Sequence, residues 1–114
     1  MNKIIAVTIG DIKGIGIQNL IRLWKDNKIE KFIFFTNKNI LINYFNQKNI
    51  NININIVEEK NLGNRNIDYK KYINIYNFKA KNNDENTYKS LILSYKYTKK
   101  NYFMGIVTLP LNKA

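Results

Sequence analysis

The chain lacks two residue types on which much protein chemistry depends. Its 114 residues include no cysteine and no histidine. The first absence excludes disulfides, thiolate metal sites and a cysteine nucleophile. The second removes the commonest metal ligand and the usual general base near neutral pH. We therefore expect no complete metal-dependent active site within these residues.

Long apolar runs are missing as well. No apolar stretch approaches the ~20 residues that a membrane-spanning helix needs. The opening segment, residues 1–9, has a short apolar run that reaches Gly10 before any small-residue cleavage site, so it is more typical of a buried strand than of a signal peptide. These features predict a soluble, cytoplasmic protein of one small domain, with no membrane partner.

Acidic residues are scarce, with 8 against 19 basic residues, and the formal net charge is +11. Such a charge ordinarily suggests nucleic acid or an anionic surface as the partner. Asn, Ile and Lys, however, make up roughly half of the chain, a bias typical of AT-rich coding sequence, and the lysines are scattered. The densest patches are only pairs, Lys70 with Lys71 and Lys99 with Lys100. Composition therefore accounts for the charge, and a basic nucleic-acid-binding domain is kept as the alternative.

What the chain does have is a regular alternation of strand-like and helix-like segments. Apolar, aromatic or alternating patterns predict strands, and apolar residues at helical spacing predict helices. The predicted strands cover residues 4–9, 32–35, 50–57, 72–78 and 103–108, and the predicted helices lie near residues 17–27, 40–45 and 85–100. This order predicts an α/β fold with a mostly parallel sheet flanked by helices, of at least four strands and three helices.

Some of these segments carry finer expectations. The strict alternation of Ile and Asn over residues 50–57 predicts an edge strand with one buried and one wet face, and the polar residues 58–71 predict a loop. Thr36 and Asn37 offer caps for the second helix. In the third helix, Asp84 is the expected cap. Its apolar residues at helical spacing are expected to form the buried face, and these are Tyr88, Leu91, Ile92 and Tyr95.

In parallel sheets, ligands usually bind beyond the carboxyl ends of the strands. The loop after the first strand contains Gly10, Gly14 and Gly16, which permit tight turning ahead of a helix that could hold an anion. The dinucleotide fingerprint needs a further glycine where this chain has Asn19, and a P-loop is also absent. The residues alone leave both a plain turn and a ligand-binding loop open.

Two longer sequence segments say more about the class of protein than the glycines alone. TIGDIKGIGIQ, residues 8–18, resembles the GDPAGIGPE-type motif of the 4-hydroxythreonine-4-phosphate dehydrogenase family. GIVTLPLNKA, residues 105–114, resembles that family's VTAPINK segment, and residues 85–100 resemble the helix leading into it. The likeness spans nearly the whole chain. It departs from the family at Ile12, Lys13 and Ile17, where the loss of two prolines relaxes a rigid loop, and at Gln18.

The resemblance implies an isocitrate- or isopropylmalate-dehydrogenase-like fold and a homodimer that uses NAD and a divalent metal. The family oxidises 4-phosphooxy-threonine, a phosphorylated hydroxy amino acid, and its product loses carbon dioxide on the route to pyridoxal 5′-phosphate (vitamin B6). The family's metal-binding histidines have no counterpart here. We therefore expect residues 1–114 to be the N-terminal α/β portion of a longer dehydrogenase, inactive alone, with neither NAD nor metal fully liganded by this chain.

Six residues match the family's motifs and are the ligand-binding candidates: Gly10, Asp11, Gly14, Gly16, Asn112 and Lys113. Asp11 could orient a polar group, and Lys113 could neutralise a phosphate or carboxylate. Each also has a simpler interpretation, as a turn cap and as a solvated lysine. No catalytic residue and no metal ligand is assigned. A truncated sheet would also expose apolar surface, and a non-catalytic interaction protein descended from the enzyme is the second alternative.

Overall fold

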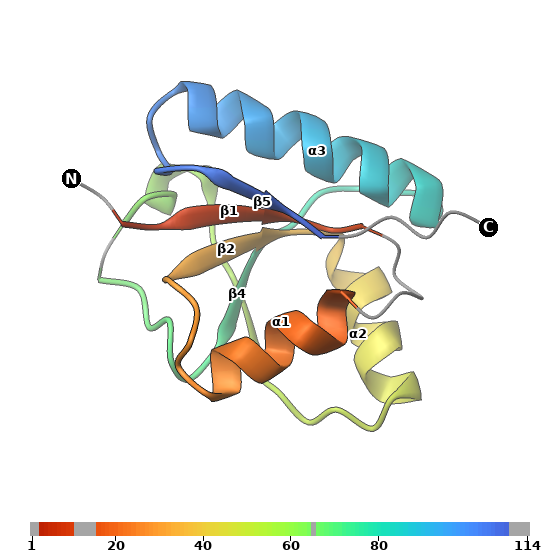
Figure 1. Ribbon diagram of the computed structural model, residues 1–114. Coiled ribbons are helices and arrows are strands. Elements are labelled where there is room, and N and C mark those ends of the chain that lie inside the picture. Colours follow the sequence, from red (N-terminus) through yellow and green to blue (C-terminus); the bar gives the residue numbers. More distant parts are fainter. Residues whose placement is uncertain (1–2, 11–15, 65, 110–114) are drawn as a thin grey trace.

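The computed structural model describes residues 3–10, 16–64 and 66–109. Within these ranges the expected α/β fold is confirmed, as five parallel strands flanked by three α-helices (Figure 1). In chain order the elements are β1 (Ile5–Thr8), α1 (Gly16–Lys25), β2 (Phe32–Phe35), α2 (Lys38–Gln47), β3 (Ile54–Ile56), the short 3-10 helix η1 (Glu59–Asn61), β4 (Ile73–Tyr76), α3 (Asn83–Lys99) and β5 (Ile106–Thr108).

The strands lie in the order β3-β4-β2-β1-β5, and every neighbouring pair is parallel. β1 is therefore flanked by β2 and β5, with Thr8 in register with both Phe35 and Thr108. Because the strands are parallel, all their carboxyl ends meet at one edge of the sheet. The first and last strands, about a hundred residues apart in sequence, consequently end side by side.

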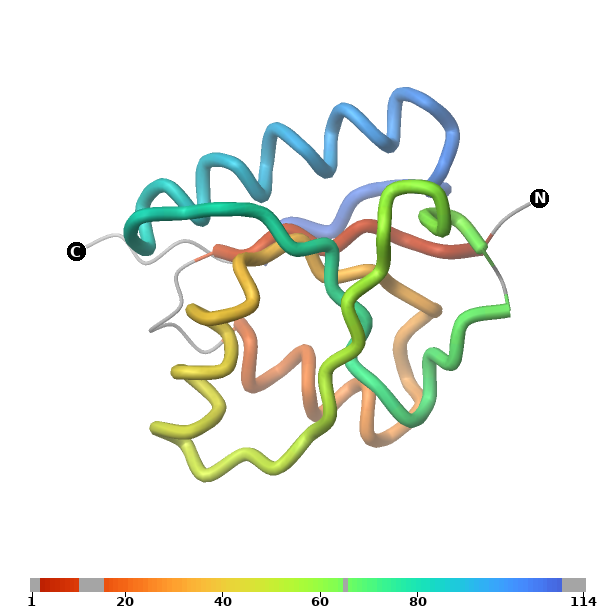
Figure 2. Tube along the Cα trace, turned by 180° about the vertical axis from the view of Figure 1, so that it is seen from behind, coloured from red at the N-terminus to blue at the C-terminus, as the bar shows by residue number. Residues whose placement is uncertain are grey.

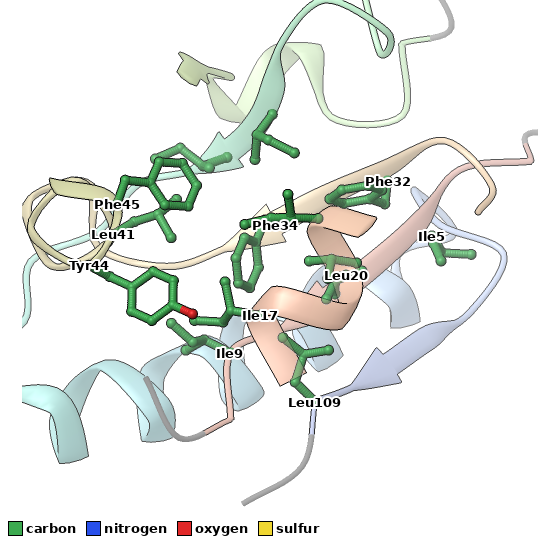
Figure 3. Packing of buried hydrophobic residues seen from close by; sticks show 14 residues of the cluster. Ile5, Ile9, Ile17, Leu20, Phe32, Phe34, Leu41, Tyr44, Phe45 and Leu109 are labelled. Carbon is green, nitrogen blue, oxygen red and sulfur yellow. The ribbon is translucent and has the colours of Figure 1, made fainter. Parts of the chain in front are cut away.

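The helices form two layers around the sheet. α1 and α2 cover one face and α3 covers the other, as both views of the chain show (Figures 1 and 2). β1 and β2 are buried along their whole lengths, since each contributes alternate side chains to both faces. Figure 3 shows the core beneath α1 and α2, where Phe34 of β2 lies among Ile17, Leu20 and Leu41. The smaller core beneath α3 contains Phe35, Tyr97 and Phe103.

All three α-helices end in the same way, at an asparagine in the left-handed backbone conformation. These residues are Asn27, Asn49 and Asn101, with φ of 55°, 55° and 65°. In each case the following amide donates to a carbonyl five residues back: Lys28 to Leu23, Ile50 to Phe45 and Tyr102 to Tyr97. This is the Schellman motif, usually closed by glycine. Asparagine tolerates the conformation better than most residues, so it ends these helices in a chain with few glycines.

The structure corrects the expected start and orientation of the third helix. α3 is capped by Asn82, whose side chain accepts a hydrogen bond from the Glu85 amide at 2.9 Å, while Asp84 lies in the first turn. The predicted apolar face points outward. Its four residues are 45–66 % exposed, and the buried face consists of Asn86, Ser90, Ser94 and Tyr97.

The structure also corrects the third strand. β3 lies at the sheet edge as expected, but it covers only residues 54–56 of the predicted 50–57. Ile50, Ile52 and Ile54 pack against the core beneath α2, so the predicted alternation holds there. Ile56 is instead 42 % exposed, and Val57 enters the core on the opposite face. The segment predicted as a loop, residues 58–71, contains one short turn of 3-10 helix, η1.

The radius of gyration is 13.0 Å, close to the ~13 Å of a compact domain of about 100 residues. Among the residues described, no helix has the length and apolar character needed to cross a bilayer.

Leu41 of α2 gives a test of the larger core, because its side chain is fully buried. Leu41→Ala should lower the free energy of unfolding by about 2–5 kcal/mol, through lost burial and a residual cavity. The control is Leu23→Ala on α1, where the leucine is 40 % exposed and the expected change is within about 0.5 kcal/mol. Urea unfolding of both variants measures the difference, and similar losses would contradict this packing.

Candidate functional site

The candidate site is the edge of the sheet where the parallel strands end. The backbone there continues the pairing of β1 and β5 past the strands, since the Leu109 amide donates to the Thr8 carbonyl at 3.3 Å. The segment after β1 begins with Ile9 and Gly10, and the segment after β5 begins with Leu109. These are the starts of the two loops singled out from the sequence, and the fold brings them together.

Ser90 of α3 joins the ends of two strands. Its buried hydroxyl accepts a hydrogen bond from the Ile9 amide at 2.8 Å and donates one to the Phe35 carbonyl at 2.5 Å. Ile9 follows β1, and Phe35 is the last residue of β2. One side chain therefore satisfies a backbone donor and a backbone acceptor that the sheet leaves without partners at this edge.

Two neighbours of Ser90 on α3 extend this arrangement. The Asn86 side chain accepts from the Asn37 amide at 2.8 Å and donates to the Thr36 hydroxyl at 3.0 Å. The Thr87 hydroxyl donates to the Gly10 carbonyl at 2.9 Å. The first two turns of α3 thus fix the chain directly after both β1 and β2.

Asn37 connects the same edge to α2 and to the segment after β4. Its side-chain oxygen accepts from the Ile40 amide at 3.1 Å, which confirms the predicted cap, and its side-chain nitrogen donates to the Phe78 carbonyl at 2.6 Å. The Asn77 side chain likewise accepts from the Lys38 amide at 2.8 Å. The polar groups after β2 are therefore engaged with the protein, and no carboxylate stands there for a nucleotide ribose.

Sequence periodicity alone missed the inward residues of α3. The four apolar residues at helical spacing predict a buried face, but a second face is defined by small polar residues that repeat every fourth position: Asn86, Ser90 and Ser94. Small polar side chains at that spacing let a helix approach a sheet closely and supply hydrogen-bonding groups where strands end. That second repeat was the signal available in the sequence.

The structure places only part of the candidate ligand set. Gly10 follows β1, with its carbonyl held by Thr87, and Gly16 is the buried first residue of α1. The other four candidates lie outside the described residues: Asp11, Gly14, Asn112 and Lys113. The structure therefore brings together the segments from which these residues continue, Gly10 on one side and Leu109 on the other.

Two ionisable side chains near this edge of the sheet have shifted pKa values, Glu85 and Tyr44. The Glu85 carboxylate pairs with Lys89 at 3.0 Å, and the hydrogen bond from Lys89 lowers the pKa of Glu85. Burial raises the pKa of Tyr44, whose ring lies between α2 and Ile9 (Figure 3). Within residues 3–10, 16–64 and 66–109, no three acidic side chains gather closely enough to hold a metal ion.

The geometry defines a class of protein, a parallel α/β domain whose strand ends are tied together by a polar helix face. No protein-family model matches the chain. No curated protein matches it significantly.

Ser90 offers the sharpest test of how the site is held together. Ser90→Ala should lower the free energy of unfolding by about 1–3 kcal/mol, because it leaves buried backbone groups of Ile9 and Phe35 without their partner. Ser94→Ala is a matched control, since the Ser94 hydroxyl bonds only the Leu91 carbonyl of its own helix. Urea unfolding of both variants should give the larger loss for Ser90, and equal effects would refute the bridging role.

Proposed function

We propose that this chain supplies part of the substrate-binding edge of an NAD-dependent dehydrogenase of the 4-hydroxythreonine-4-phosphate dehydrogenase type. The supporting observation is that the two resembling segments, far apart in sequence, leave adjacent parallel strands at one edge, where Leu109 bonds Thr8. Ligands of parallel α/β sheets bind at such edges. An isocitrate-dehydrogenase-like architecture and a cytoplasmic location belong to the same proposal.

In the proposed reaction, the substrate hydroxyl is oxidised to a ketone. A hydride passes to NAD⁺ and the hydroxyl proton is released, and the product then loses carbon dioxide. This chain's part is to bind and orient the phosphorylated end of the substrate. Lys113 is proposed to neutralise its phosphate, because an ammonium group forms strong charge-assisted hydrogen bonds with phosphate oxygens. Asp11 is proposed to orient a polar group, and the three loop glycines let the backbone approach the ligand closely.

Metal and proton-transfer chemistry in this proposal come from groups outside these 114 residues. The chain has no histidine, and its described residues form no group of three metal-ligating side chains. We therefore assign no catalytic step to it, and it should not reduce NAD⁺ with 4-phosphooxy-threonine when assayed alone. Its proposed contribution is ligand binding, which can be measured without turnover.

The test is a titration of the isotope-labelled chain with 4-phosphooxy-threonine, followed by nuclear magnetic resonance. The amide signals of Gly10, Gly16 and Leu109 should shift together. Lys113→Ala should weaken binding roughly tenfold, the loss expected for about 1.4 kcal/mol. Lys28→Ala is the control, because Lys28 follows α1 at the opposite edge of the sheet, and it should leave the affinity unchanged.

Two outcomes would contradict the proposal. One is the absence of shifts at this edge with millimolar ligand. The other is equal weakening by both lysine variants, together with tighter, steeply salt-dependent binding of a single-stranded oligonucleotide. That second pattern would support the nucleic-acid alternative, because affinity for nucleic acid falls strongly with salt.

A further inference from the structure

The outer face of α3 carries an apolar stripe that nothing in the described chain covers. Its residues and exposed fractions are Tyr88 at 66 %, Leu91 at 50 %, Ile92 at 45 % and Tyr95 at 56 %. In Figures 1 and 2, α3 is the only α-helix on its side of the sheet among the described residues, and no helix or strand is drawn over its outer surface. Single exposed apolar residues are ordinary, but contiguous ones mark interaction surfaces.

The stripe continues onto β5, the outermost strand on one side of the sheet. Leu91, Ile92 and Tyr95 line a shallow groove with Ile106 and Thr108 of β5. β5 is the last strand on that side of the sheet, and its Thr108, which lines this groove, is exposed. The uncovered surface therefore includes both a helix face and an edge strand, two features that proteins commonly bury against a partner.

Opposite charges stand at the two ends of the stripe. Asp84, in the first turn of α3, and Lys99, in its last turn, are both exposed and share the face of the four apolar residues at 100° per residue. The Lys99 ammonium lies 5.3 Å from the centre of the Tyr95 ring, so it reaches the stripe itself.

The residues of this face have the same spacing whether they are counted from the N-terminal or from the C-terminal end of α3. The residues stand at positions 84, 88, 91, 92, 95 and 99, so the pairs 84 with 99, 88 with 95 and 91 with 92 share one midpoint. A two-fold axis through that midpoint turns the face onto itself, with the charges exchanged. Such self-complementarity is what an isologous contact between two copies requires.

We infer that this face is a contact between two copies of the chain, with their α3 helices packed antiparallel about a two-fold axis between Leu91 and Ile92. Tyr88 then meets the partner's Tyr95, and Leu91 meets the partner's Ile92. Asp84 meets the partner's Lys99, twice by symmetry. Antiparallel packing also sets the helix dipoles in their favourable orientation.

The net charge of the chain indicates how strong the contact between the two copies can be. A net charge of +11 on each copy opposes association. A weak dimer is expected, dissociating in the micromolar range. The inference uses α3 and β5 alone, so it stands or fails independently of the proposed dehydrogenase function.

The test is a charge exchange measured by sedimentation equilibrium at physiological ionic strength. Asp84→Lys and Lys99→Asp should each weaken dimerisation at least tenfold, because each puts like charges together at both ends of the contact. The double variant D84K/K99D should restore it, because the two opposite charges again meet across the axis. Asp26→Lys and Lys25→Asp make the same charge changes at the end of α1, on the other side of the sheet, and should have no such effect.

Circular dichroism of every variant checks that α3 stays folded, since Asp84 and Lys99 also stabilise the helix ends. A wild-type chain that remains monomeric at several hundred micromolar would overturn the inference. A dimer that survives Leu91→Asp, or that the double exchange does not restore, would overturn it as well.

Discussion

The fold depends on the hydrogen bonds by which α3 closes the ends of β1 and β2. Ser90 bridges the Ile9 amide and the Phe35 carbonyl, and Asn86 holds the chain after β2. Buried backbone groups without partners are costly, so a polar helix face is favoured at this position over an apolar one. The remaining features of α3 follow. Its small polar residues face the sheet, Tyr97 completes the core at its far end, and its apolar residues are left on the outside.

Asparagine, one of the commonest residues of this chain, has defined structural roles in it. Asn27, Asn49 and Asn101 end the three helices, and Asn37 and Asn82 begin two of them. The buried Asn74 accepts a hydrogen bond from Asn55 and so links β4 to β3. A compositional bias is compatible with a specific fold here, because the asparagine amide both donates and accepts hydrogen bonds and its backbone tolerates the left-handed conformation.

The parallel topology gives the chain its candidate site. Crossover connections send every strand in the same direction, so segments distant in sequence emerge at one edge. The polar groups after β2 are engaged in holding that edge together, and the proposed ligand contacts lie instead in the segments that follow β1 and β5. The proposed phosphate contact and the proposed contact between copies use different surfaces, the first at the strand ends and the second on the outer side of α3.

The sequence by itself determined the alternation of strands and helices, the bounds of β2, the cap at Asn37 and the apolar face of α1, because these follow from local spacing and local hydrogen bonding. It also indicated the strand-end loops as the candidate site. Only the tertiary structure decided which face of α3 meets the sheet and how much of residues 50–57 pairs with β4. Periodicity shows which residues share a helix face. Whether that face is buried depends on the backbone groups that neighbouring strands leave unpaired, and those belong to residues about fifty to eighty positions away.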